Sequence, residues 1–120
     1  MKKPSKSHNN KIKIGYQELT LGIQKPTFQN EIDSYGEFDH KKNTISITEN
    51  LSDADYSCTL IHEILHAIVY YYGLTQSGQP LDSDAKEEIV VNNIANGLTA
   101  ALKDNSFLLK ELTQRLHNVR

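Results

Sequence analysis

Apolar and polar residues alternate in the first part of the chain, which is typical of strands with one buried face. Isoleucine alternates with lysine over residues 12–14, and leucine or isoleucine occupies every second position over residues 19–23. Gly15 lies between these stretches and is interpreted as a bulge, and Pro26 is expected to end the second stretch. The pattern therefore predicts two half-buried strand segments near the start of the domain.

A further strand signal has the form of a hairpin. Residues 36–39 are followed by a polar turn over residues 40–43 and then by residues 44–48, in which isoleucine alternates with serine and threonine. His40, in the turn, is interpreted as an ordinary solvated side chain. Together with the earlier segments, the hairpin predicts a small antiparallel sheet of about three strands.

A long helix is predicted after the hairpin. Ser52 or Asp53 provides an N-cap, and Gly73 is a suitable left-handed stop after about Tyr72. Apolar residues occupy much of the helix circumference, as expected for a helix buried in the middle of a small domain. The single cysteine, Cys58, lies in this apolar stretch and is interpreted as a small core residue.

Two more helices are predicted in the second half of the chain. Asp82 or Ser83 caps a long helix over about residues 84–103, and Ser106 caps a third helix over about residues 107–118. The third helix carries a leucine stripe that predicts docking on the core. Its members are Leu108, Leu109, Leu112 and Leu116. The whole pattern predicts an α+β fold in which the sheet packs on two long helices and a C-terminal helix closes one side.

Composition narrows the function classes. The chain has 120 residues, which suits a disordered basic arm over residues 1–10 and a single folded domain over residues 11–120. A net charge of −2 gives no general attraction to nucleic acid or to an anionic membrane. We expect neither a membrane span nor a secretory signal, because no long apolar run is present. One cysteine suits a reducing compartment, so the cytoplasm is the expected location.

The segment His62-Glu63-Ile64-Leu65-His66 carries the candidate chemistry. On a helix, residues four apart lie on one face, so His62 and His66 can direct ring nitrogens at a single metal ion. Glu63 is adjacent to one ligand without sharing its direction, so its carboxylate can reach a water molecule held by the metal. These three residues predict two zinc ligands and a general base.

A catalytic zinc site needs a third protein ligand and one open position for water. The other histidines are poor candidates, because they lie in the arm, in a turn and near the C-terminus. The second long helix offers Glu87 and Glu88 instead. Glu88 lies on one helical stripe with Val91, Ala95, Leu98 and Leu102, whereas Glu87 lies on a stripe with Val91 and Ile94. Periodicity alone leaves both glutamates open as the third ligand.

Together with the motif at residues 62–66, the segment over residues 88–95 resembles small gluzincin-type zinc metallopeptidases of the ImmA/IrrE group and of phages and prophages. In that group a glutamate on the second helix binds zinc, commonly with a small residue three positions later and Asn or Asp four positions later. Glu88 matches this order and Glu87 does not, although Val91 is bulkier than the usual small residue. The resemblance implies that Glu88 completes the set of ligands for a Zn²⁺ ion.

The resemblance covers roughly residues 12–105 and implies a zinc-dependent peptidase. A metal-activated water would attack the peptide bond, with Glu63 as the general base. Asn92 would orient a ligand imidazole, whereas Glu87 would be a spare residue whose loss changes little. A peptide or protein substrate would extend along the free edge of the strand over residues 44–48.

A second interpretation is a catalytically weak zinc protein of phage type that docks on a protein partner. The resemblance suggests regulatory targets such as repressors. No residue is a clear donor to the transition state, since Tyr70, one turn after His66, is interpreted as a packing residue. Glu63 favours the enzyme, because a purely structural site does not need a base beside a ligand.

Overall fold

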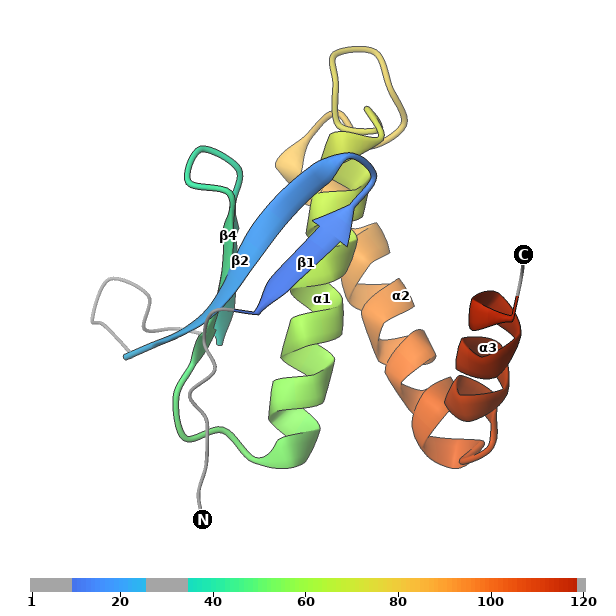
Figure 1. Cartoon of the computed structure of the whole chain (residues 1–120). Coiled ribbons are helices and arrows are strands. Elements are labelled where there is room, and N and C mark those ends of the chain that lie inside the picture. Colours follow the sequence, from blue (N-terminus) through green and yellow to red (C-terminus); the bar gives the residue numbers. More distant parts are fainter. Residues whose placement is uncertain (1–9, 26–34, 119–120) are drawn as a thin grey trace.

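The computed structural model describes residues 10–25 and 35–118, which form an α+β fold (Figure 1). The expected arm lies outside this part except for residue 10, and Pro26 lies outside it too. The strands are β1 (Lys11–Ile14), β2 (Gln17–Gln24), β3 (Gly36–Asp39) and β4 (Thr44–Thr48). The helices are α1 (Asp53–Tyr71), α2 (Asp84–Asp104) and α3 (Leu108–His117). Among the described helices, none combines the length and apolarity needed to span a bilayer.

The described sheet has four strands in the order β1-β2-β4-β3. The pairs β1–β2 and β3–β4 are antiparallel, whereas β2 and β4 run parallel with Leu21 opposite Ile45. The predicted hairpin of β3 and β4 is confirmed, but the expectation of about three strands, all antiparallel, is wrong. Alternation along a strand reveals its buried face but not its neighbour or direction, and β4 pairs with β2 only after the chain has passed through β3.

Gly15 forms a turn rather than the expected bulge. β1 and β2 are an antiparallel hairpin in which Ile14 lies opposite Gln17, so only Gly15 and Tyr16 connect the strands. Gly15 has a φ of +62°, which suits a residue without a side chain. The two stretches of alternating residues are therefore neighbouring strands and not one interrupted strand.

Local capping groups define the ends of the two long helices. Ser52 and Ser83 each accept a hydrogen bond from the backbone N–H three residues later, at the starts of α1 and α2. Gly73 follows α1 with a φ of +82°, as predicted. For α3 the prediction is wrong: the N-cap is Phe107, without a side-chain hydrogen bond, and not Ser106.

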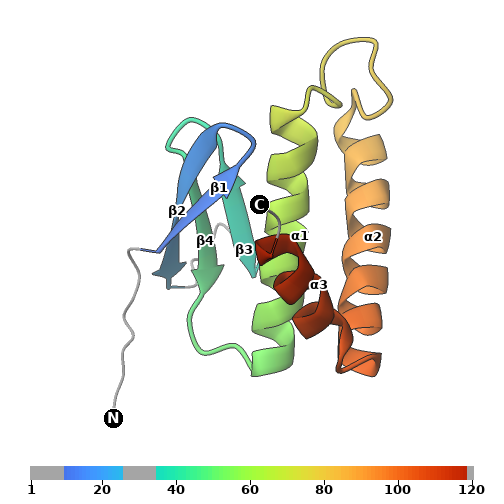
Figure 2. The same cartoon turned by 45° about the vertical axis from the view of Figure 1, so that its right-hand side comes forward.

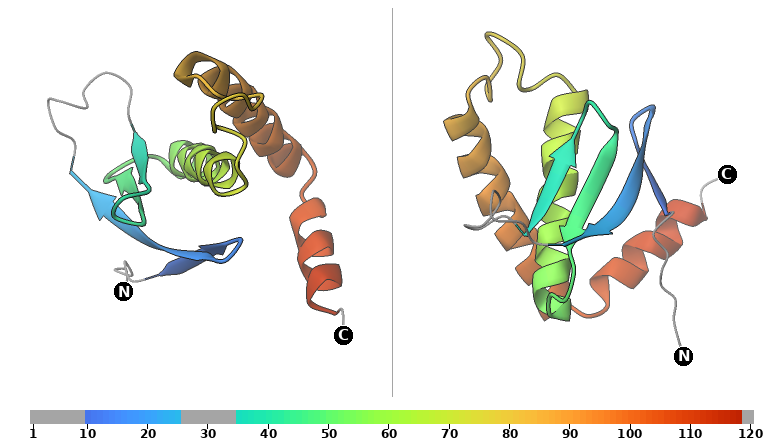
Figure 3. Two further views of the ribbon diagram at one scale, coloured as in Figure 1. Left: turned by 90° about the horizontal axis from the view of Figure 1, so that it is seen from above. Right: turned by 90° about the vertical axis from the view of Figure 1, so that its left-hand side faces the viewer.

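Two apolar clusters lie on opposite sides of α1, which separates the sheet from α2 (Figures 2 and 3). The first joins α1 to the sheet and contains the buried residues Ile14, Leu19, Ile45, Ile47 and Ala67. The second joins α1 to α2 and contains the buried residues Val69, Leu81 and Val91. This central position explains why α1 is apolar around much of its circumference.

The leucine stripe of α3 is not docked on the core, contrary to expectation. Leu109, Leu112 and Leu116 are 57%, 47% and 72% exposed, and α3 has no buried residue. On α2, Leu98 is 42% exposed although it lies on the same apolar stripe as the buried Val91 and Ala95. Periodicity identifies the apolar face of a helix, but it does not show that another element covers that face.

Gly36 allows β3 to lie very close to α1. A Cβ atom on Gly36 would lie 2.7 Å from Thr59 Cγ2, 3.1 Å from the Ser46 carbonyl oxygen and 3.2 Å from Glu63 Cγ. Real Cβ atoms almost never approach other atoms as closely as the first of these contacts, so the Thr59 side chain or the strand would have to shift. The contact therefore ties the edge of the sheet to the part of α1 that carries Glu63.

Gly36→Ala is expected to lower the free energy of unfolding by about 1–3 kcal/mol, the usual range for overpacking. Urea unfolding measures this change. Gly22→Ala, on β2, is the matched control, because a Cβ there would meet no atom within 4 Å. The control should be neutral or slightly stabilising. Equal stabilities for the two variants would show that the fold does not depend on this close approach.

Candidate metal centre

Two imidazole rings on α1 and one carboxylate on α2 converge on a small volume. The rings of His62 and His66 are 4.7 Å apart between centroids and inclined by 77°. Their Nε2 atoms lie 3.8 Å and 3.3 Å from the carboxylate oxygens of Glu88. One ligand atom from each residue lies within 4.8 Å of the others. Tetrahedral zinc ligands about 2.1 Å from the ion lie about 3.4 Å apart, so this set fits a zinc ion after small adjustments.

The antiparallel packing of α1 on α2 produces this arrangement. From one contact to the next, the residue number increases by four on α1 and decreases by four on α2. The result is a row of polar contacts between the helices, here called the polar row. Its members are Cys58–Asn96 at 3.6 Å, His62–Asn92 at 2.7 Å and His66–Glu88 at 3.3 Å. The motif histidines are therefore held opposite the glutamate by helix register.

Glu87 and Glu88 approach His66 from different sides. Glu88 Oε2 faces Nε2 of His66, whereas Glu87 Oε2 lies 2.5 Å from Nδ1 of the same ring. The Glu88 side chain is 53% exposed and the Glu87 side chain is 20% exposed. The structure thus brings Glu88 together with both histidines, as expected from the sequence. It also gives Glu87 a close contact, although Glu87 was expected to be a spare residue.

Asn92 contacts His62 at Nε2, the ring nitrogen that a metal would use. A contact at Nδ1 would instead have left Nε2 available. Its Oδ1 atom lies 2.7 Å from Nε2, while Oε2 of Glu63 lies 3.2 Å from Nδ1. Both ring nitrogens therefore face oxygen acceptors. The hydrogen bond to Glu63 is the main cause of a pKa of His62 that is raised above its usual value, and burial opposes this shift. A metal ion at Nε2 of His62 would have to displace the Asn92 contact.

Glu63 is buried beneath the edge of the sheet, with 8% of its side chain exposed. It contacts His62 rather than the Nε2 atoms that face Glu88. Glu63 nevertheless lines the same cleft as the three candidate ligands. A carboxylate beside the ligands, in a largely shielded position, is suited to exchange a proton with a molecule bound in that cleft.

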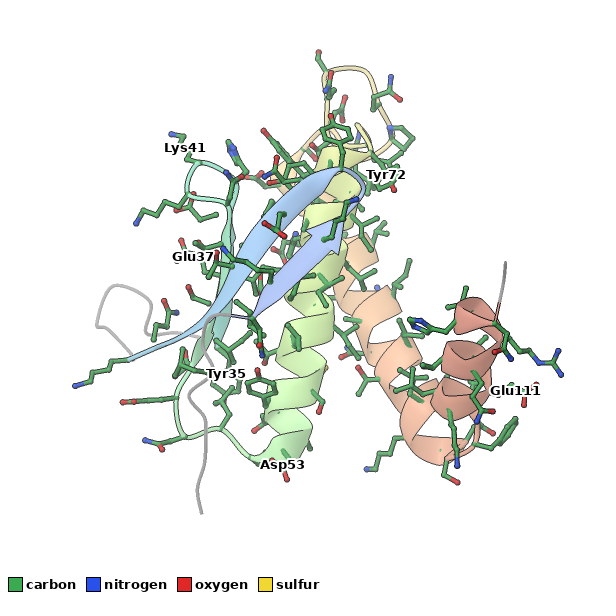
Figure 4. The ribbon with its side chains drawn as sticks, in the orientation of Figure 1. Tyr35, Glu37, Lys41, Asp53, Tyr72 and Glu111 are labelled. Atoms are coloured by element: carbon green, nitrogen blue, oxygen red, sulfur yellow. The ribbon has the colours of Figure 1, made fainter. Side chains whose placement is uncertain are left out.

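The cleft has a volume of about 920 Å³ and lies between β3, α1 and α2. Residues 35–38 form its sheet side, and the side chains of Tyr35 and Glu37 are labelled in Figure 4. We expected the strand over residues 44–48 to provide a free edge here, and this is wrong. β4 lies inside the sheet between β2 and β3, and among the described strands it is β3 that lies at the edge beside the cleft (Figure 3).

Cys58 and His40, outside the motif, make contacts that the sequence did not predict. Cys58 is half-buried and lines the cleft, rather than lying in the core. His40 is exposed but stacks on Tyr70 with ring centroids 4.5 Å apart, and its Nδ1 atom lies 3.2 Å from the Tyr70 hydroxyl. This pair lines a second hollow of about 280 Å³ that also includes Glu87. Residues separated by 30 positions in a turn and a helix give no local signal of such a contact.

Neither models of known protein families nor a search of curated proteins provides a match to this chain. The resemblance to the ImmA/IrrE group therefore rests on the residues of the two helices. The geometry above depends on none of these comparisons. What it provides is a set of nitrogen and oxygen ligands of the kind that zinc prefers, within a cleft large enough for a peptide segment.

Glu88→Ala is expected to lower zinc affinity by more than about 100-fold, because removal of a neighbour of a ligand already costs about 10- to 100-fold. Competition with a chromophoric zinc indicator measures the affinity. Glu18→Ala is the control, because Glu18 is exposed on β2 and its substitution removes the same charge. Wild-type affinity in Glu88→Ala would contradict the assignment of the third ligand.

Proposed function

We propose that this chain is a zinc-dependent peptidase. The convergence of His62, His66 and Glu88 beside the buried carboxylate of Glu63 carries the proposal. The three candidate ligands come from two helices, and all of them line the cleft. Their nitrogen and oxygen donors match those of catalytic zinc sites, which keep one position open for water. A carboxylate next to such a site is the second requirement for hydrolysis by water.

Bound zinc would polarise the peptide carbonyl and lower the pKa of water towards neutrality. Glu63 then takes a proton from the attacking water as the new carbon–oxygen bond forms. The same carboxyl group gives that proton to the leaving nitrogen as the peptide carbon–nitrogen bond breaks. Glu63 lines the cleft, and to do this its carboxylate must turn from His62 Nδ1 towards the substrate.

The edge of β3 is the natural place for the substrate backbone. An extended peptide that pairs with an edge strand gains main-chain hydrogen bonds without regard to sequence, while side pockets select its side chains. β3 lies beside Glu63 because Gly36 permits the close contact with α1. A peptide or protein segment paired with β3 would therefore pass over the candidate ligands.

The second candidate is a catalytically weak zinc protein that acts by docking on a protein partner, such as a regulatory protein. The exposed apolar face of α3 favours it, because Leu109, Leu112 and Leu116 would be covered by such a partner. Wild-type protein that binds zinc tightly but hydrolyses no member of a diverse peptide library would favour this candidate over the peptidase.

Glu63→Gln is expected to keep zinc and fold but to reduce hydrolysis by at least about 100-fold, the usual size of general-base effects. Glutamine retains an oxygen that can accept from His62 Nδ1, so the ring stays oriented. Cleavage of a fluorescent peptide library, with zinc content measured on the same samples, tests this. Glu18→Gln serves as the control. Equal rates for Glu63→Gln and wild type, above a metal-free blank, would exclude Glu63 as the base.

Removal of zinc is expected to lower the melting temperature, because the ion would link α1 to α2. Zinc at 100 times its dissociation constant stabilises a protein by about 2.7 kcal/mol, which corresponds to a shift of several degrees or more in a domain of this size. Melting curves with zinc and with a chelator measure the shift. Glu88→Ala should melt at the same temperature under both conditions. Superimposed wild-type curves would show that the ion does not stabilise the fold.

A further inference from the structure

His66 has a carboxylate on each of its ring nitrogens, and both carboxylates come from α2. Glu88 Oε2 lies 3.3 Å from Nε2, and Glu87 Oε2 lies 2.5 Å from Nδ1. The side chains of His66 and Glu87 are only 13% and 20% exposed. Water therefore competes weakly for the contact between Glu87 and Nδ1.

A carboxylate oxygen only accepts hydrogen bonds, so the contact with Glu87 requires a proton on Nδ1 of His66. A neutral imidazole has one N–H group, which leaves the lone pair on Nε2. Nε2 is the nitrogen that faces Glu88 and the nitrogen that a metal would use. We propose that Glu87 is a positioning residue that fixes the ring of His66, and its neutral tautomer, for zinc binding; this rests on the zinc centre proposed above.

The two histidines differ in the origin of this support. His62 has its Nδ1 partner, Glu63, on its own helix, whereas the partner of His66 comes from the facing helix. Adjacent helical residues point about 100° apart, so Glu87 and Glu88 can reach opposite nitrogens of one ring. The docking of α2 therefore delivers a ligand and a positioning group together, and His66 depends on α2 for both.

The place of Glu87 on α2 also suits a purely structural role, stabilisation of the helix. Glu87 and Asp84 are the acidic residues in the first turn of α2, where negative charge stabilises a helix. Asp84→Ala removes that benefit without removing a contact to His66. It is therefore the matched control that separates helix stabilisation from support of the imidazole.

The test compares Glu87→Ala, Glu87→Gln and Asp84→Ala with wild type, using zinc affinity from indicator competition at one pH. Glu87→Ala should bind zinc about 10- to 100-fold more weakly, the usual effect of losing a partner of a ligand. Glu87→Gln keeps an acceptor oxygen and should fall between Glu87→Ala and wild type. Asp84→Ala should change affinity less than about threefold. Far-UV circular dichroism of the metal-free proteins checks that each variant folds.

A spectroscopic readout isolates the hydrogen bond itself. In ¹⁵N-histidine-labelled, zinc-loaded protein, the Nδ1 proton of His66 should give a downfield resonance that exchanges slowly with water. Glu87→Ala should abolish this resonance, Glu87→Gln should retain it at a shifted position, and Asp84→Ala should leave it unchanged. An unchanged resonance in Glu87→Ala, or wild-type zinc affinity in that variant, overturns the proposal.

The affinity measurements separate this proposal from the proposed peptidase. In one outcome, Glu87→Ala binds zinc more weakly than wild type, and wild type hydrolyses no peptide. This outcome would support the role of Glu87 and contradict the peptidase. Hydrolysis by wild type, with equal zinc affinity in Glu87→Ala, would do the reverse. A wild type without zinc affinity would overturn both.

Discussion

The antiparallel contact between α1 and α2 determines whether the candidate site exists, because no single element carries a complete set of ligands. α1 supplies His62 and His66, and α2 supplies Glu88. The buried residues Val69 and Val91, together with Leu81, hold the two helices in register behind the polar row. A shift of one residue along either helix would turn the polar row away from the cleft, since adjacent residues point about 100° apart.

Three carboxylates gather around two imidazole rings in the cleft. Glu63, Glu87 and Glu88 surround two imidazole rings in a site that is only partly open to water. Like charges at such separations repel, and protonation of an imidazole relieves this repulsion, in agreement with the direction of the His62 pKa. A divalent ion would relieve it more completely, because it places positive charge between the carboxylates and the rings.

Local features of the sequence predicted the two long helices and the shared face of His62 and His66. Ser52, Ser83 and Gly73 lie where their capping chemistry requires, and two histidines four residues apart must share a helical face. Non-local features were missed. Alternation in β2 contains no information about parallel pairing with β4, and the stripe of Glu87 does not reveal that its carboxylate reaches the opposite nitrogen of His66.

The layered arrangement would also set the lifetime of an ion held at the candidate site. α1 packs on the sheet through one cluster and on α2 through another, so α2 can open locally while the sheet and α1 remain folded. Such an opening would remove Glu88 and Glu87 together and leave two imidazoles, a far weaker site. Ion release would then follow the opening rate of one helix rather than global unfolding, and a ligand that spans β3 and α2 would slow it.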